Sequence, residues 1–386
     1  MPWPFTDFPD TPQRVQEPAQ FRPADWPTRP AQGGPDKAQL KAALGEEVEA
    51  LHDLQRRFHA DARQALLVVF QAMDAGGKDS TIRAVFSGVN PSGVRVTSFK
   101  APSHLERSHD FLWRTVQALP ARGQIGVFNR SYYEDVLIAR VHPELAGDGA
   151  DAPGFWDERL RSITAHERHL AHNGTVVLKF WLHLSPEQQR ERFLRRLRKP
   201  DKHWKFDESD VRERAHWDDY MAAYEAAIAT THMEWAPWYV IPADDKPAMR
   251  LMVAQVIRGT LEAMGPQFPT VSDERAARLQ RLAQELDPVL LGSLAAGACS
   301  LPPSSPRPLP SRPRPLLSLP CNHQHRHQHQ CSHQLQHGCC GCCCCCTHCC
   351  CCCCCCHPHH RRRRRHPPLG TAARCCGLSA ADTQWA

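Results

Sequence analysis

Cysteine is missing from the chain before residue 299, and all 20 cysteines lie between Cys299 and Cys376. A body without cysteine has no use for disulfides and fits a reducing compartment, so we expect a cytoplasmic location. The uneven distribution also marks a boundary, because the composition changes sharply near residue 295.

Long apolar runs are also missing. No stretch is apolar for long enough to cross a bilayer, so we expect no membrane association. The first residues lack a basic segment followed by an apolar one, which argues against a secretory signal. The hydrophobic fraction of 42% and the formal net charge of +6 are ordinary for a globular chain.

The 386 residues divide into four regions by composition and periodicity. Residues 1–33 are rich in proline and polar residues, which predicts an extended N-terminal arm. Residues 34–270 carry alternating apolar patterns of one folded domain, and 271–294 read as a helical extension. Residues 295–386 form a low-complexity tail rich in Cys, His, Pro and Arg, where no period of 2 or 3.6 is visible. We expect this tail to be disordered.

Strand-like and helix-like segments alternate through the domain. Short apolar runs at 65–70, 94–99, 125–128, 175–184 and 238–241 suit buried strands. Helical spacing of apolar residues appears at 36–63, after 81, and at 112–119, 155–172, 186–197, 211–229 and 242–264. The alternation predicts an α/β fold, with a central parallel sheet of about five strands and helices on both faces.

The segment QAMDAGGKDST at 71–81 joins the first predicted strand to a helix. The first turn of a helix has unpaired backbone N–H groups, and the helix dipole favours an anion there. Gly76 and Gly77 let the backbone curl close to phosphate oxygens, and Lys78 adds a cation. The match to the Walker A spacing is partial, because Ala72 replaces the first glycine and Asp79 the Ser/Thr after lysine. The alternative is an ordinary turn with a surface lysine.

Asp74 is unusual in such a loop, since a carboxylate repels phosphate. It becomes useful if a divalent cation lies between the two, and Mg²⁺ is commonly held by one carboxylate together with substrate phosphates. The alternative is a helix N-cap, for which aspartate is well suited.

Two further segments carry charge that suits phosphate. The strand at 125–128 runs into Asn129 and Arg130 at the carboxyl edge, where ligands bind in parallel sheets. Arg130 either chelates phosphate or forms a salt bridge to Glu134 or Asp135. The basic helix at about 189–198, with lysines up to Lys205, predicts a lid at about 186–210. Its charge density fits a polyanion, although a basic run is often only a solvated face.

With these pieces in order, the chain resembles the polyphosphate kinase 2 family over about residues 36–265. The resemblance is carried by QAMDAGGKDSTI at 71–82, SGVNP at 87–91, SFKAPS at 98–103, FLWR at 111–114, GVFNRSYYE at 126–134, RFLRR at 192–196, KHWKF at 202–206, WDDY at 217–220, APW at 236–238 and IPAD at 241–244. Within the first of these segments, residues 75–76 are Ala75-Gly76, where the family more often has Ala-Ala.

The resemblance implies a P-loop kinase fold with a helical lid and a Mg²⁺-dependent transfer of phosphoryl groups between inorganic polyphosphate and nucleoside mono- or diphosphates (AMP/ADP or GMP/GDP). It implies no specific nucleic-acid partner, and it suggests a homo-oligomer. Asp74, Lys78 and Arg130 would be catalytic, with Asp74 also binding the metal. The other implied polyphosphate or nucleotide contacts are Gly76, Gly77, Asp79, Ser80, Thr81, Arg83, Lys100, Asn129, Glu134, Arg192, Arg196, Lys202 and Lys205. Asn129, where other members have Asp, resembles the subgroup that uses both mono- and diphosphates.

Two other functions stay open from the residues alone. An ATP-dependent nucleotide or small-molecule kinase would share the loop and the lid, although the dense basic helix argues against it. A metal- or RNA-binding protein could act through the tail. Zinc sites, however, use spaced cysteine pairs with folded chain between them, and the tail has unbroken cysteine runs at 342–346 and 349–356.

Overall fold

The computed structural model describes residues 4–286. These residues belong to the first of two structural units, Met1–Ser300. The predicted tail at 295–386 and the last part of the predicted helical extension lie outside the described residues. Within residues 4–286, no helix combines the length and the apolar character that a membrane span needs.

Five parallel strands form the central sheet, which confirms the predicted α/β class. They are β1 (Ala65–Gln71), β2 (Val94–Ser98), β3 (Ile125–Asn129), β4 (Thr175–His183) and β5 (Trp238–Pro242), in the order β2-β3-β1-β4-β5. Every residue of β1 is buried, which explains why its sequence is a continuous apolar run rather than an alternating one. From β1 the chain passes to β2 on one side, whereas β4 lies on the other. This reversal beside β1 is the place where α/β sheets bind ligands.

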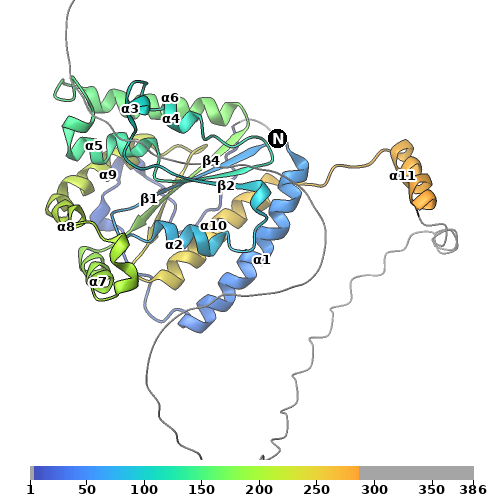
Figure 1. Ribbon diagram of the computed structural model, residues 1–386, viewed down its shortest axis with the longest axis horizontal. Helices are drawn as coiled ribbons and strands as arrows, with labels where there is room; N and C mark the ends of the chain where they lie inside the picture. The colour runs from blue at the N-terminus through green and yellow to red at the C-terminus, as the bar shows by residue number, and fades with distance from the viewer. Residues whose placement is uncertain (1–3, 287–386) are drawn as a thin grey trace, which may run out of the picture. The chain divides into compact units, whose positions relative to one another are not determined.

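Helices cover both faces of the sheet (Figure 1). Successive residues of β1 point to opposite sides: Leu66 and Val68 pack with α1 (Lys37–Asp61), α2 (Lys78–Val85) and α10 (Lys246–Met264). Leu67 and Val69 pack in the other core with α6 (Phe155–His172) and α9 (Trp217–Thr231). The remaining helices are α3 (His104–Arg107), α4 (Trp113–Val116), α5 (Ile138–Val141), α7 (Pro186–Leu197), α8 (Ser209–Glu213) and α11 (Asp273–Leu286).

Some helix boundaries differ from the sequence-based ones. The predicted helix at 112–119 is only one turn long, α4. The predicted helix at 211–229 is split into α8 and α9 by the 3₁₀ turn Arg214–His216. Helical spacing of apolar residues continues through such a turn, so the break is invisible to periodicity alone.

The N-terminal arm, residues 4–33, has two 3₁₀ turns, Pro18–Gln20 and Pro23–Asp25, as its only helical segments in the described part. Phe5 and Phe8 are buried in the core that contains α10. Arg14 then bridges Tyr239 in antiparallel fashion, with Val240 N donating to Gln13 O at 2.8 Å. The arm therefore pairs with β5 on the edge away from β4.

Candidate active site

The phosphate loop, residues 72–77, leaves the carboxyl end of β1 and turns into α2. Its backbone is in the left-handed region at Ala75 (φ +59°) and Gly77 (φ +105°). A Cβ at Gly76 would lie 2.5 Å from Ala72 Cβ and 2.7 Å from Met73 O, so only glycine fits. The loop thus presents the first N–H groups of α2 to the outside of the sheet edge, as phosphate binding requires.

Lys78, the first residue of α2, folds back over the loop. Its Nζ donates to Ala72 O at 2.7 Å. Burial lowers the pKa of Lys78, and the nearby Arg130 lowers it further, while Asp74, Glu134 and Asp79 act in the opposite direction. A poorly solvated ammonium beside open N–H groups is a ready partner for an anionic oxygen.

Arg130 follows β3 with a left-handed backbone (φ +65°), which is unusual for arginine. Its Nη2 donates to Asp74 Oδ1 at 3.0 Å, and Nη1 lies 3.9 Å from Glu134 Oε2. Glu134 raises the pKa of Arg130 most, burial opposes this, and Asp74 raises it further. Of the two salt-bridge partners expected for Arg130, Glu134 is near it, whereas Asp135 pairs with Arg114 at 3.5 Å and the unexpected Asp74 is the nearest carboxylate. These ion pairs lie at the same edge where the phosphate loop opens, so the salt-bridge and phosphate-binding interpretations of Arg130 are compatible.

The segment that carries Arg130 is anchored by a buried polar cluster. Glu167 Oε1 accepts from the hydroxyls of Tyr132 (2.9 Å) and Tyr133 (2.8 Å). Its Oε2 pairs with Lys179 Nζ of β4 at 2.5 Å, and both charged side chains are 0% exposed. A buried ion pair with its hydrogen bonds satisfied resists rearrangement, so it fixes the chain just after the strained Arg130.

Asn129 ends β3, and its side chain contacts the end of β2 and the first turn of α2. Its Nδ2 donates to Asp79 Oδ1 at 2.6 Å and to Ser98 Oγ at 3.2 Å. Its Oδ1 is buried and accepts no hydrogen bond from the described residues. A carboxylate in place of this amide would face Asp79 and repel it, so the amide allows the two side chains to touch.

The helix α7, which lies in the segment predicted to form a lid, contacts the loop through Arg192, which is 3% exposed. Arg192 Nη1 donates to Ala75 O and Gly76 O, both at 2.9 Å, and Nη2 donates to Ala243 O and Asp244 O. Burial lowers the pKa of Arg192 to about 10. The side chain therefore holds two carbonyls of the loop, whose shape is also fixed by the bond from Gly76 N to Met73 O at 2.9 Å.

One cleft of about 710 Å³ gathers most of the predicted site residues. Those that line it are Asp74, Gly76, Gly77, Lys78, Asp79, Ser80, Arg83, Lys100, Asn129, Arg130, Arg192, Arg196 and Lys202. They come from the loop and α2, from the ends of β2 and β3, and from the lid. Ten arginine or lysine residues and four aspartates line this cleft, which makes it a site for anions.

A family model described as polyphosphate kinase 2 matches residues 34–269. The chain belongs to the polyphosphate kinase 2 family. This membership confirms the predicted enzyme class, a transferase that moves phosphoryl groups between polyphosphate and a nucleotide.

Individual relatives agree with the polyphosphate kinase 2 assignment. The chain is 48% identical over 279 residues to an ADP-polyphosphate phosphotransferase of Rhodopseudomonas palustris, covering 71% of this chain and 96% of that protein. An AMP/ADP-polyphosphate phosphotransferase of Meiothermus ruber is 45% identical over 251 residues, covering 65% and 90%. The crystal structure of polyphosphate kinase 2 from Arthrobacter aurescens TC1 is similar at a TM-score of 0.66 and 37% identity, covering 72% of this chain and 98% of that one.

Two predicted residues of this polyphosphate kinase 2 chain, Thr81 and Glu134, do not line the cleft. Thr81 is fully buried, with its hydroxyl 3.9 Å from Met249 Sδ. Glu134 lines a neighbouring cavity of about 40 Å³, and the Asp74–Arg130 pair lines both spaces. Lys205 ends the 3₁₀ segment Pro200–Lys205, and its side chain is outside the described part.

Two cations of the cleft were missed by the sequence analysis, Lys246 and Arg250 on α10, whereas Arg195 on α7 belongs to the basic helix that it identified. Burial lowers the pKa of Lys246 to about 7, and Arg192, Arg195, Arg250 and Arg196 add to the effect. Arg250 Nε is buried without a hydrogen-bond partner among the described residues. A signal was present, since Lys246 and Arg250 closely follow β5 and carboxyl ends of parallel strands share one edge.

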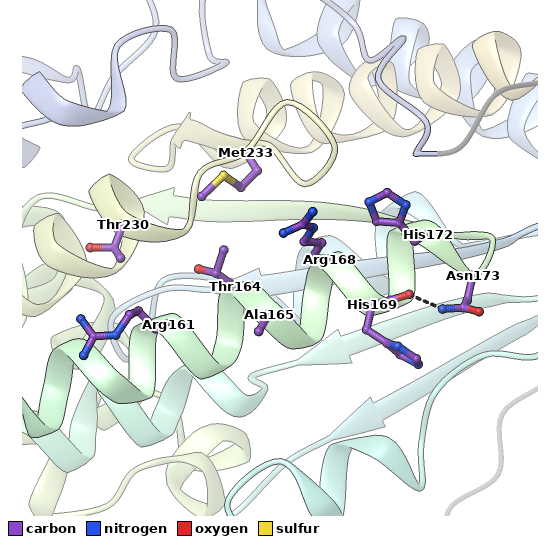
Figure 2. Close-up of a pocket in the computed structure, with 9 residues that line it drawn as sticks. All are labelled: Arg161, Thr164, Ala165, Arg168, His169, His172, Asn173, Thr230 and Met233. Atoms are coloured by element: carbon purple, nitrogen blue, oxygen red, sulfur yellow. Dashed lines mark hydrogen bonds between the residues drawn. The ribbon is translucent and has the colours of Figure 1, made fainter.

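A separate groove of about 560 Å³ runs along α6 (Figure 2). It is lined by Arg161, Thr164, Ala165, Arg168, His169, His172, Asn173, Thr230 and Met233. It contains none of the predicted site residues.

Proposed function

We propose that this enzyme transfers phosphoryl groups from inorganic polyphosphate to AMP and ADP, with the polyphosphate chain held in the cleft above the phosphate loop. The observation that carries the proposal is the charge of the cleft. Its ten lysines and arginines outnumber its four aspartates by six, a larger positive charge than one nucleoside triphosphate neutralises, and they continue from the loop to α7 and α10. A long polyanion neutralises such a row.

Lys78 and Arg130 would contact the transferred group itself. Phosphoryl transfer needs little covalent help, so positioning and charge neutralisation dominate. Lys78 exchanges its bond to Ala72 O for a bond to a phosphate oxygen, and Arg130 offers two parallel donors beside it. The α2 N–H groups hold the neighbouring phosphate, and Arg192 keeps the loop in the shape that presents them.

The residues present also fit a magnesium ion. Asp74 and Asp79 both line the cleft and offer hard carboxylate oxygens, the ligands Mg²⁺ prefers alongside phosphates. Asp74 would hold the ion, with Asp79 nearby. When bound, the ion would neutralise the charge that develops on the phosphate oxygens.

The nucleotide range rests on the relatives and on Asn129. The two relatives described above are named for ADP and for AMP/ADP, and a Pseudomonas aeruginosa relative, 33% identical over 253 residues, is named for GDP. Asn129 touches Asp79 through an amide, which gives the strand end less negative charge than Asp would. We infer an enzyme for both mono- and diphosphates, in a cytoplasmic setting that suits its cysteine-free body.

Product analysis tests this function. AMP, ADP, GMP and GDP are each incubated with Mg²⁺ and long-chain polyphosphate as the only donor, and the nucleotides are separated by chromatography. We expect ADP and then ATP from AMP. Phosphorylation that occurs with ATP as donor but not with polyphosphate would overturn the proposal in favour of an ordinary ATP-dependent kinase.

A further inference from the structure

Asp244 lies at the point where the N-terminal arm, the lid and the phosphate loop meet. It follows β5 by two residues, and its side chain is 3% exposed. Its carboxylate accepts four hydrogen bonds. Two come from Ser185 (N at 2.9 Å and Oγ at 2.9 Å), one from Thr28 Oγ1 at 3.1 Å and one from Arg29 Nε at 3.2 Å.

The contacts of Asp244 reach the lid through Ser185. Ser185 is the N-cap of α7, and its Oγ accepts from Gln188 N at 3.1 Å. One turn further along, Gln189 Nε2 donates to Asp74 O at 2.9 Å. The start of the lid helix is thus fixed at one end by Asp244 and bonded at the other to the loop residue proposed to bind magnesium.

The backbone of Asp244 leads to the loop by a second route. Its carbonyl, with that of Ala243, accepts from Arg192, whose other Nη holds Ala75 O and Gly76 O. Its N–H donates to Thr28 O at 2.9 Å. Through its side chain and its backbone, Asp244 therefore connects the arm to the start of α7 and to Arg192, which both contact the phosphate loop.

The arm residues in these contacts lie before residue 34, where the family match begins. We propose that Asp244 is a positioning residue, and that Thr28 and Arg29 of the arm hold it so that α7 and Arg192 keep the phosphate loop in its binding shape. The arm then contributes to catalysis in addition to packing against the folded domain. Small displacements of supporting groups are enough to lower a rate, because reacting atoms must be held closely.

Full-length variants test the arm contact. The double variant Thr28→Val/Arg29→Ala removes both side-chain donors, and Thr28→Ser/Arg29→Lys restores a hydroxyl and a cation. The matched control is Arg22→Ala, which breaks an arm ion pair to Glu225 (3.1 Å) and none of the hydrogen bonds of Asp244 described above. Asp244→Asn keeps the shape of the side chain but removes the charge and one acceptor.

We expect the Val/Ala variant to raise the KM for polyphosphate and lower kcat, with a combined loss in kcat/KM of roughly tenfold to a hundredfold. The Ser/Lys variant recovers most of it, Arg22→Ala matches wild type, and Asp244→Asn loses at least as much as Val/Ala. A defect of stability alone would lower the active fraction without changing KM. Asp244→Asn and the Val/Ala variant change the two sides of one contact. The loss in kcat/KM of the two changes combined should therefore be less than additive.

Hydrogen exchange gives a readout that does not depend on the proposed reaction. Exchange should rise in the loop at 72–77 and at the start of α7 in the Val/Ala variant, and stay unchanged in α1 and α6. Wild-type kcat/KM together with wild-type exchange in the Val/Ala variant would overturn the proposal, even if Asp244→Asn fails to fold. Local exchange changes in an enzyme that never uses polyphosphate would instead overturn the proposed function alone.

Discussion

The cations of the cleft differ in how each is held, residue by residue. Lys78 is enclosed by the phosphate loop and tied to Ala72 O, whereas Lys246 is half-buried at the start of α10 among arginines. The first is placed to contact the transferred group. Lys246 lies where burial and the positive charge of the neighbouring arginines oppose its protonation. Each environment leads to a different test.

Replacing Lys78 by alanine should lower kcat/KM by roughly two to three orders of magnitude, since a cation aimed at developing charge is lost in a poorly hydrated site. The fold should stay intact, because removing the half-buried ammonium relieves a desolvation penalty while the bond to Ala72 O is lost. Steady-state kinetics and a thermal melt check both. Lys41→Ala, at an exposed site on α1, is the control. A folded Lys78→Ala enzyme with near-normal turnover would contradict the assignment.

Lys246 predicts a pH dependence of binding. With its pKa at about 7 in the empty cleft, the side chain is about half charged near neutrality. A bound polyanion favours the ammonium and raises this pKa, so binding takes up a proton. Affinity for polyphosphate should therefore weaken as pH rises from about 6 to about 8, by at most about tenfold per pH unit from this group.

Titration calorimetry with Lys246→Arg and Lys246→Met isolates this effect from the titration of polyphosphate itself, which all variants share. Lys246→Arg keeps its charge, so its affinity should fall less steeply with pH than that of wild type. Lys246→Met should bind more weakly than wild type at the acidic end and approach it at the alkaline end. Parallel slopes in all three proteins would show that Lys246 does not titrate in this range.

At the scale of elements, the phosphate loop depends on close packing of its own backbone. Gly76→Ala would place a Cβ 2.5 Å from Ala72 Cβ and 2.7 Å from Met73 O, so the loop must shift. We expect a loss of about 1–3 kcal/mol in the free energy of unfolding, as for other overpacked sites, and a raised KM for polyphosphate. Urea unfolding and kinetics measure the two effects.

Gly45→Ala is the matched control because Gly45 lies inside α1 with no atom within 4 Å of the added Cβ. It should stabilise the protein by up to about 1 kcal/mol and leave the kinetics unchanged. Similar effects of the two substitutions on KM would mean that the shape of the loop does not control polyphosphate binding.

At the scale of the whole molecule, local patterns were enough for the sheet and the loop. Buried parallel strands such as β1 read as unbroken apolar runs, and the glycines with Lys78 mark the strand-to-helix turn. Local patterns do not report which distant segments meet. Arg192 was expected to grip the substrate, but its contacts to Ala75 O and Gly76 O depend on how α7 docks.

The same limit explains why Thr81, which was predicted, does not line the cleft and why Arg250, which was not predicted, does. Thr81 fits the motif spacing, yet a helix turns its side chain toward Met249 and the core. Arg250 lies in a long helix whose pattern resembles any amphipathic segment, and only the docking of α10 beside the loop brings it to the cleft. Side-chain direction and tertiary contacts decide these positions, and neither is encoded in a short motif.

Deleting residues 295–386 should leave the enzyme active. The described residues that line the cleft all lie at or before Arg250, and the family match ends at residue 269. The Arthrobacter aurescens kinase is covered over 98% of its length by 72% of this chain, so the shared architecture does not need the rest.

The run Arg361–Arg365 can still attract polyphosphate non-specifically, an effect that salt removes. Kinetics of the full-length and shortened proteins at low and high ionic strength separate this non-specific attraction from any role of the tail in the reaction. We expect equal kcat at both, with at most a modestly higher KM for the shortened protein at low salt. A large loss of kcat at both ionic strengths would show that the tail takes part in the reaction.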